Sequence, residues 1–257
     1  MRKLTPLASK SAILINAGLV IGIIALLLSY SRGAWLALVV GSIVGICIHY
    51  KKLKHLLLAA FGIVILFVGW LSYHNNFLRF VPDFQHTIFH KDFSQHLNAT
   101  VQLKDVSNAE RFYRWTAAIN MIEAKPITGF GPNNFYDNYK AYAIDIFKTW
   151  VSNNPDHSSV HNYFLLTALE QGLVGLFLFV MLIVGMLLAT EKLYHRFLNK
   201  FYKITTLTTG IIISMIIVVN VLSDLIETDK MGSLFWLSLG TIFFLEEKQK
   251  EELQSIA

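Results

Sequence analysis

The sequence predicts an all-α polytopic membrane protein with about six transmembrane helices and one large, mainly helical extracytoplasmic loop between the third and the fourth. Only 15% of the 257 residues are charged, whereas 54% are hydrophobic; a soluble domain has about 25% charged residues. The apolar residues also form runs close to the ~20 residues that cross a bilayer as a helix. These observations exclude a disordered chain and argue against a water-soluble globular domain.

Six apolar runs are the predicted spans. The first is too long for the core of a signal peptide and has no small-residue cleavage site after it, so we expect it to be retained. Three runs precede the predicted loop and three follow it: Ala12–Leu28, Ala34–Ile48, Leu56–Leu71, Leu173–Ala189, Ile204–Leu222 and Met231–Leu245.

Basic clusters lie at residues 51–55 and 192–203. Because cytoplasmic loops are rich in Lys and Arg, we place both clusters and both chain ends in the cytoplasm. The formal net charge of +5 then reflects membrane topology rather than nucleic-acid binding. The predicted parts of the chain are three transmembrane helices in 1–72, an extracytoplasmic loop module in 73–171, three transmembrane helices in 172–245, and a cytoplasmic tail in 246–257.

Within the loop module the sequence predicts a helix over 108–124. Ser107–Glu110 has capping-box spacing, and Lys125-Pro126 supplies a stop. Arg111 projects into the apolar stripe of this helix, and Arg114 lies at its edge. An arginine in such a stripe needs an anion, which is either a protein carboxylate or a ligand phosphate or carboxylate; a structural ion pair or a snorkelling side chain is the alternative to a ligand. The stripe consists of Phe112, Trp115, Ala118, Ile119 and Ile122.

Arg32 stands between the first two spans on the outer side, where topology does not require positive charge. Snorkelling explains most such arginines. Here Gly33 lets a ligand approach closely, and Trp35 marks the membrane interface. Two outer arginines, Arg32 and Arg111, would suit a pyrophosphate head group, because arginine binds phosphate oxygens bidentately without a metal.

The loop module also contains a turn-rich segment, 127–135, with Gly129 and Gly131 near a proline. It lacks the GxGxxG and Walker patterns, so a shaped turn is favoured over a phosphate loop. Three tyrosines follow at helical spacing, and a packed face is favoured over stacking on sugars. They are Tyr136, Tyr139 and Tyr142.

His157 and His161 are four residues apart, as in a zinc site on a helix. The glutamate of HExxH and a third ligand are both missing, so zinc is disfavoured. The single cysteine, Cys47, excludes an intrachain disulfide and a cysteine-based metal site. A neutral imidazole at His161 would suit a general base, although a structural histidine is the alternative.

The residues from His161 to Gln171 are predicted to form a helix at the membrane surface, with the span starting near Leu173. The reason is Glu170, because a carboxylate deep in lipid is costly. The last outer turn is acidic, and a solvated turn is favoured there over a cation or acceptor site. Its acidic residues are Asp224, Glu227 and Asp229.

An ordered set of motifs resembles the O-antigen ligase and O-antigen polymerase superfamily, which includes bacterial protein O-oligosaccharyltransferases. The resemblance covers about Leu26 to Met186. The motifs, in order, are Ser31-Arg32-Gly33-Ala34, Arg111 four residues before Trp115, Pro126 with Gly129–Phe135, and His161–Leu165 before Glu170–Gly175.

The resemblance implies a membrane glycosyltransferase that moves a glycan from an undecaprenyl-pyrophosphate carrier to a glycan, lipid or protein hydroxyl, with inversion and without metal or other cofactor. It places the chain in the bacterial cytoplasmic membrane with its site on the extracytoplasmic face. By resemblance His161 is the base, and Arg32 and Arg111 hold the pyrophosphate. Weaker candidates for substrate binding are Arg114, His157 and Asn162.

Family members usually have more than six spans, so the chain resembles their C-terminal half. This favours a partner chain that supplies the N-terminal helices, and it leaves an inactive fragment as an alternative. The sequence also allows a catalytically silent scaffold or carrier-binding subunit of a glycan-assembly complex, and it allows a transporter. The sequence does not identify the acceptor. It therefore leaves open whether the protein is a ligase, a polymerase or a protein glycosyltransferase.

Overall fold

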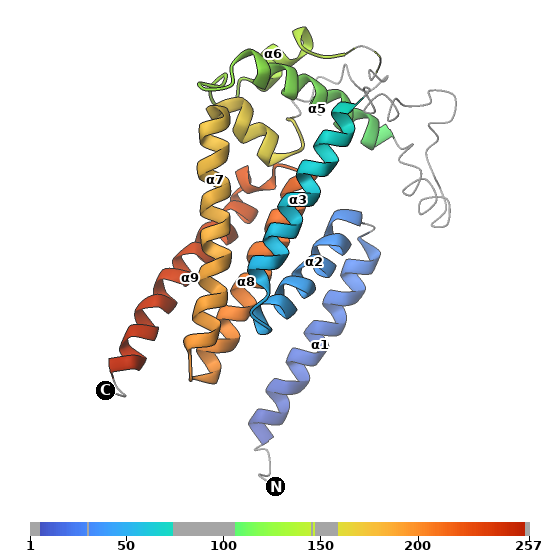
Figure 1. The fold of residues 1–257 in the computed structure, drawn as a ribbon. Helices are drawn as coiled ribbons and strands as arrows, with labels where there is room; N and C mark the ends of the chain where they lie inside the picture. Colours follow the sequence, from blue (N-terminus) through green and yellow to red (C-terminus); the bar gives the residue numbers. More distant parts are fainter. Residues whose placement is uncertain (1–5, 30, 74–105, 145, 147–158, 255–257) are drawn as a thin grey trace.

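A computed structural model of the protein describes residues 6–29, 31–73, 106–144, 146 and 159–254. Every regular element within these ranges is a helix, which confirms the predicted all-α class (Figure 1). The elements are α1 (Pro6–Leu28), α2 (Arg32–His49), α3 (Leu53–Ser72), α5 (Val106–Ala124), α6 (Phe135–Asn138), the 3-10 helix η2 (Tyr139–Ala141), α7 (Tyr163–Arg196), α8 (Lys200–Val221), the 3-10 helix η4 (Leu225–Glu227) and α9 (Asp229–Gln254).

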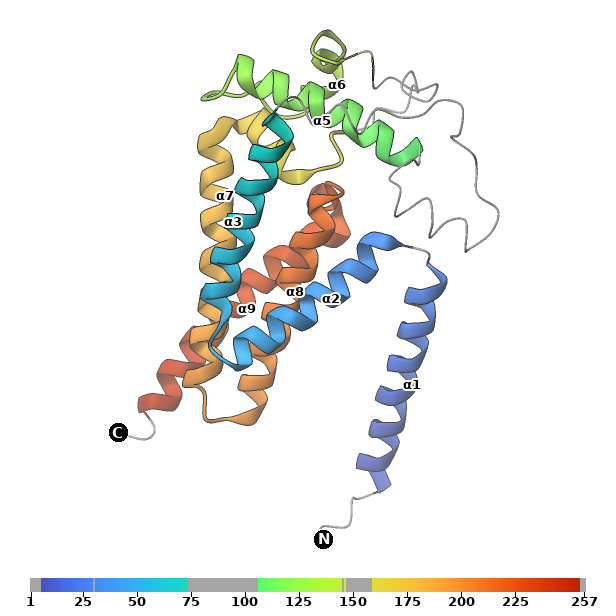
Figure 2. The ribbon, with the colours of Figure 1, turned by 45° about the vertical axis from the view of Figure 1, so that its right-hand side comes forward.

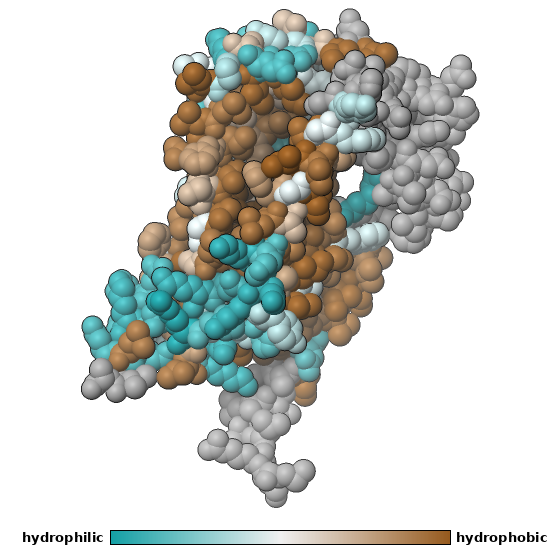
Figure 3. All heavy atoms as spheres, in the orientation of Figure 1, coloured by the Kyte–Doolittle hydropathy of each residue, from teal (hydrophilic) through white to brown (hydrophobic). Residues whose placement is uncertain are grey.

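Four of the described helices are long and apolar enough to cross a bilayer, namely α2, α3, α7 and α8. The first and last predicted spans lie in α1 and α9. The described apolar part of α1, Ile13–Leu28, is shorter, so crossing by these two helices stays a prediction, as does the division of the chain into four parts. Apolar side chains cover the middle of the bundle and polar residues gather at both ends (Figure 3), as expected for a membrane-embedded bundle.

Small residues bring α2 and α8 close together. Gly41 and Gly45 are four residues apart and therefore lie on one face of α2, in a GxxxG arrangement. A Cβ atom on Gly41 would lie 2.8 Å from Met215 Cγ, and one on Gly45 would lie 2.9 Å from Ile211 Cδ1. A larger residue at either position would force the Met215 or Ile211 side chain to move, so the close crossing of α2 on α8 favours glycine at both positions.

The helix α5 lies across one end of the bundle, beside the beginning of α7 and the end of α3 (Figures 1 and 2). The beginning of α1 and the end of α9 lie at the opposite end. Which end of the bundle faces the cytoplasm stays a prediction, as does the placement of the whole loop module.

The boundaries of α5 confirm the predicted helix to within two residues, and α5 ends before Pro126. Its predicted buried face is wrong by about one residue: Arg114 is only 8% exposed, whereas Ile119 is 45% exposed. The reason is that α5 packs on α7 and η2 through the face that carries Tyr113, Ala117 and Met121, which turns Ile119 away from the contact. The buried residues of α5 are Glu110, Tyr113, Arg114, Ala117, Ala118 and Met121.

The predicted tyrosine stripe is confirmed as a packed face, although it spans two short elements, α6 and η2, rather than one helix. Tyr139 is buried, and its ring stacks on Phe135 and meets Tyr113 edge-on. Tyr136 and Tyr142 are half-buried against the same cluster.

The helix α7 breaks at Gly172, where φ is 72° and ψ is −179°. The break separates a short segment, Tyr163 to Gln171, from the long apolar segment that begins at Leu173. The predicted helix before Leu173 is therefore confirmed as a separate segment, with its first residue at Tyr163 rather than His161.

The turn after α5 satisfies the backbone groups that this break frees. Phe130 N donates to Leu169 O at 2.8 Å, Gly131 N donates to Glu170 O at 3.0 Å, and Leu173 N donates to Pro126 O at 2.8 Å. Unpaired buried backbone groups are costly, most of all near lipid. Segment 127–135 is thus the predicted shaped turn, and the amides of Phe130 and Gly131 are used by α7.

We predict that Gly172→Ala destabilises the protein by more than about 2 kcal/mol, because alanine strains a positive φ and its Cβ would collide with Ile127 O. The melting temperature in detergent should fall by about 4 °C or more. The matched control is Gly185→Ala in the same helix, where a Cβ meets nothing within 4 Å. Equal melting temperatures for the two variants would contradict this account of the break.

Candidate active site

Four segments meet at the α5 end of the bundle and enclose a cavity of about 440 Å³. Arg32 at the start of α2 and Arg111 on α5 both line it, together with the end of α8 and the turn that follows. The two predicted arginines, 79 positions apart in the sequence, therefore face one space. The other lining residues are Ser31, Gly33, Ala34, Val219, Leu222, Ser223 and Leu225.

Local capping places Arg32 at this cavity. Ser31 is the N-cap of α2, and its hydroxyl accepts a hydrogen bond from Ala34 N at 3.4 Å. The Trp35 indole donates to Leu26 O at 2.9 Å, which ties the first turn of α2 to the end of α1. The sequence predicts Arg32 and Gly33 between the first two spans, whereas both residues belong to the first turn of α2.

His161 lies two residues before α7 in a backbone conformation that is uncommon for a residue other than glycine. Its φ is 55°, in the left-handed region that costs energy for a side chain other than glycine. Its amide donates to Ser159 Oγ at 3.3 Å. The imidazole is 41% exposed, so it is held in position and still open to a ligand.

The turn between α8 and α9 brings a carboxylate to this histidine. Asp224 Oδ1 is 3.9 Å from His161 Nδ1, and the Asp224 side chain is only 17% exposed. Tyr163 N donates to Ser223 O at 3.0 Å and fixes the turn against the start of α7. The prediction of a solvated acidic turn is therefore wrong for Asp224, although Glu227 and Asp229 are exposed.

Two further predicted residues have partners within the protein. Asn162 is the N-cap of α7, and its side chain accepts a hydrogen bond from Leu165 N at 3.0 Å. Arg114 is buried, with Nη2 3.4 Å from Glu110 Oε2 and Nη1 donating to Ser159 O at 3.1 Å. Arg114 therefore holds the chain two residues before His161.

The pKa of His161 is lowered from its ordinary value, mainly because the imidazole is partly buried. The positive charges of Arg114 and Arg111 lower this pKa further, whereas the negative charges of Asp224 and Glu110 raise it. His161 is therefore neutral at neutral pH. The Asp224 carboxylate favours the tautomer with the proton on Nδ1, which leaves the lone pair on Nε2.

The structure thus places His161, Arg32 and Arg111 at the same end of the bundle, where the two arginines share a cavity that His161 does not line and the charge of Arg111 reaches His161. His157 lies outside the described residues, and no group of three or more His, Cys, Asp or Glu side chains suited to a metal ion occurs in the part of the chain that the structure describes. Sequence reasoning missed Glu110 and Asp224 as partners in the site. The i to i+4 spacing of Glu110 and Arg114 was a usable signal, whereas Asp224 is 63 positions from His161.

Comparison with known proteins gives one family. A family model described as O-Antigen ligase matches residues 17–180, a stretch that includes the starts of α2 and α7 and all of α5. No curated protein and no solved structure matches the chain.

We predict that two charge changes move the pKa of His161 in opposite directions. Arg114→Gln removes a positive charge and should raise this pKa, whereas Asp224→Asn removes a negative charge and should lower it further. Histidine NMR of the labelled protein in nanodiscs measures the pKa, with His161→Asn identifying the signal. A shift in the same direction in both variants would contradict the electrostatic account.

Proposed function

The chain belongs to the O-antigen ligase family, a membrane glycan-processing family, and from this premise we propose that it transfers a glycan from an undecaprenyl-pyrophosphate carrier to an acceptor hydroxyl. The observation that carries the proposal is the cavity that Arg32 and Arg111 share, next to a neutral histidine. We place this reaction at the extracytoplasmic face of the bacterial cytoplasmic membrane.

In the proposed reaction the acceptor oxygen forms a bond to the anomeric carbon while the bond from that carbon to the pyrophosphate breaks. The hydroxyl proton passes to Nε2 of His161, and the electron pair leaves on the pyrophosphate. Attack in line with the leaving group inverts the configuration at the anomeric carbon. The lowered pKa of His161 keeps the imidazole unprotonated and able to accept this proton.

The arginines have a separate role in this scheme. Negative charge develops on the pyrophosphate as it leaves, and guanidinium groups aimed at that position stabilise the transition state more than the ground state. Because Arg32 and Arg111 come from different helices, they face the cavity from two directions. This arrangement suits two phosphoryl groups in one ligand.

Asp224 and Arg114 are positioning residues in the proposal. Asp224 orients the imidazole and stabilises it once protonated, as carboxylates beside catalytic histidines do. Arg114 fixes the backbone at Ser159 and at the same time opposes early protonation of His161 through its charge.

We predict that His161→Asn lowers the transfer rate by about 100-fold or more, the usual contribution of a general base, while carrier binding is unchanged. Asparagine is chosen because it tolerates the left-handed backbone at this position better than alanine does. The assay follows glycan transfer and release of undecaprenyl pyrophosphate in nanodiscs. The matched control is His55→Asn, an exposed histidine on α3 at the opposite end of the bundle. Turnover that persists in His161→Asn would exclude the base.

We also predict that Arg32→Gln and Arg111→Gln each weaken binding of undecaprenyl pyrophosphate by about tenfold, because each removes charge-assisted hydrogen bonds. Transfer should slow as well, since the same groups act in the transition state. Arg196→Gln, an exposed arginine at the far end of α7, is the control for lost positive charge. Unchanged binding in both cavity variants would remove the pyrophosphate assignment.

A further inference from the structure

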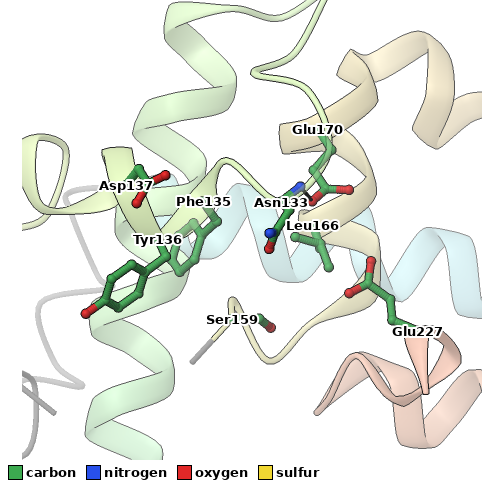
Figure 4. A pocket seen from close by; sticks show the side chains of 8 residues that line it. All are labelled: Asn133, Phe135, Tyr136, Asp137, Ser159, Leu166, Glu170 and Glu227. Atoms are coloured by element: carbon green, nitrogen blue, oxygen red, sulfur yellow. Dashed lines mark hydrogen bonds between the residues drawn. The ribbon is translucent and has the colours of Figure 1, made fainter. Parts of the chain in front are cut away.

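A second cavity, of about 200 Å³, lies beside the site and has a different chemical character. Its lining residues are Asn133 in the turn after α5, Phe135, Tyr136 and Asp137 on α6, Ser159 before His161, Leu166 and Glu170 on α7, and Glu227 in η4. No lysine or arginine is among its lining residues. The carboxylates of Glu170 and Glu227 point into the space between α7 and η4 (Figure 4).

One short turn separates this space from the arginine cavity. Leu225 lines the arginine cavity, Glu227 lines the second cavity, and Asp224 faces His161. Ser159 also lines the second cavity, and its hydroxyl accepts the His161 amide. His161 itself lines neither cavity, but its neighbours line both: Ser159 lines the second cavity, and Ser223 and Leu225, which flank Asp224, line the arginine cavity.

The polar groups of the second cavity match the hydroxyl groups of a sugar. A hydroxyl donates one hydrogen bond and accepts others, and carboxylates accept while a carboxamide both donates and accepts. Tyr136 and Leu166 add apolar surface for the C–H groups of a ring. The volume is below the ~300–1,000 Å³ of pockets for drug-sized ligands, which suits a single ring.

The two carboxylates are close enough to influence each other. The pKa of Glu227 is raised, first because the side chain is partly removed from water and then because of the negative charges of Glu170 and Asp224. A ligand that brings another negative charge here would be repelled. Glu170 Oε1 accepts the Asn133 amide at 2.7 Å, which fixes its carboxylate at the wall of the cavity.

We propose that this second cavity is the acceptor subsite, and that it selects a sugar ring without phosphate or carboxylate groups. The inference rests on the proposed function, because it assigns the acceptor of the same reaction. The acceptor hydroxyl enters from the anionic side of His161, and the pyrophosphate donor lies on the cationic side. Opposite charges on the two sides keep the anionic donor out of the acceptor subsite.

Binding of small sugars tests this inference without requiring turnover. The probes are methyl glucoside and methyl galactoside and the 6-phosphate of each, added to the full chain in nanodiscs and followed by saturation-transfer NMR. We expect wild type to bind the neutral glycosides at least about tenfold more tightly than their phosphates. Glu170→Gln combined with Glu227→Gln should remove most of this preference while keeping an acceptor oxygen at each position.

Glu123→Gln, an exposed glutamate on α5, is the matched control and should keep the wild-type preference. Equal or tighter binding of the phosphates by wild type, or an undiminished preference in the double variant, would overturn the inference. Absence of sugar binding would overturn it as well. Selective sugar binding without glycan transfer would instead contradict the proposed reaction, and the cavity would then be a sugar-binding site but not an acceptor subsite.

Discussion

Three backbone hydrogen bonds between the turn after α5 and the break in α7 join α5 to the helix bundle. The break exists because Gly172 adopts a positive φ, and it is stable because the turn from Pro126 to Gly131 takes up the freed groups. Glycine is required on both sides of this contact, since a Cβ on Gly129 would collide with Glu170 O. The contact fixes the end of α5 on the short first segment of α7, the segment that His161 precedes.

Charge is distributed around His161 by elements that are remote in the sequence. Positive charge comes from Arg111 and Arg114 on α5, and negative charge comes from Glu110 on α5 and from Asp224 in the turn between α8 and α9. His161 is neutral although it lies beside the Asp224 carboxylate, because partial burial of the imidazole and the two arginine charges together outweigh the effect of the carboxylates on its pKa. The same end of the bundle has two cavities of different charge, one lined by Arg32 and Arg111 and the other by Glu170 and Glu227.

Much of this arrangement follows from local sequence patterns. The Pro126 stop, the apolar runs and the cost of burying Glu170 in lipid were enough to predict the end of α5, the spans in four helices and a separate helix before Leu173. Non-local features were not predictable. The buried face of α5 depends on which side meets α7, and the pairing of Asp224 with His161 depends on how α8 ends, which a single sequence does not encode in any local pattern.

Arg32 lies at the beginning of α2, well beyond the glycines at which α2 crosses α8. A rotation of α2 about this crossing therefore moves Arg32. Arg32 is nine positions from Gly41, or about 13 Å along the helix. A rotation of about 5° at the crossing therefore displaces the start of α2 by about 1 Å. We therefore expect a larger side chain at Gly41 or Gly45 to shift Arg32 relative to Arg111 although neither glycine lines the cavity.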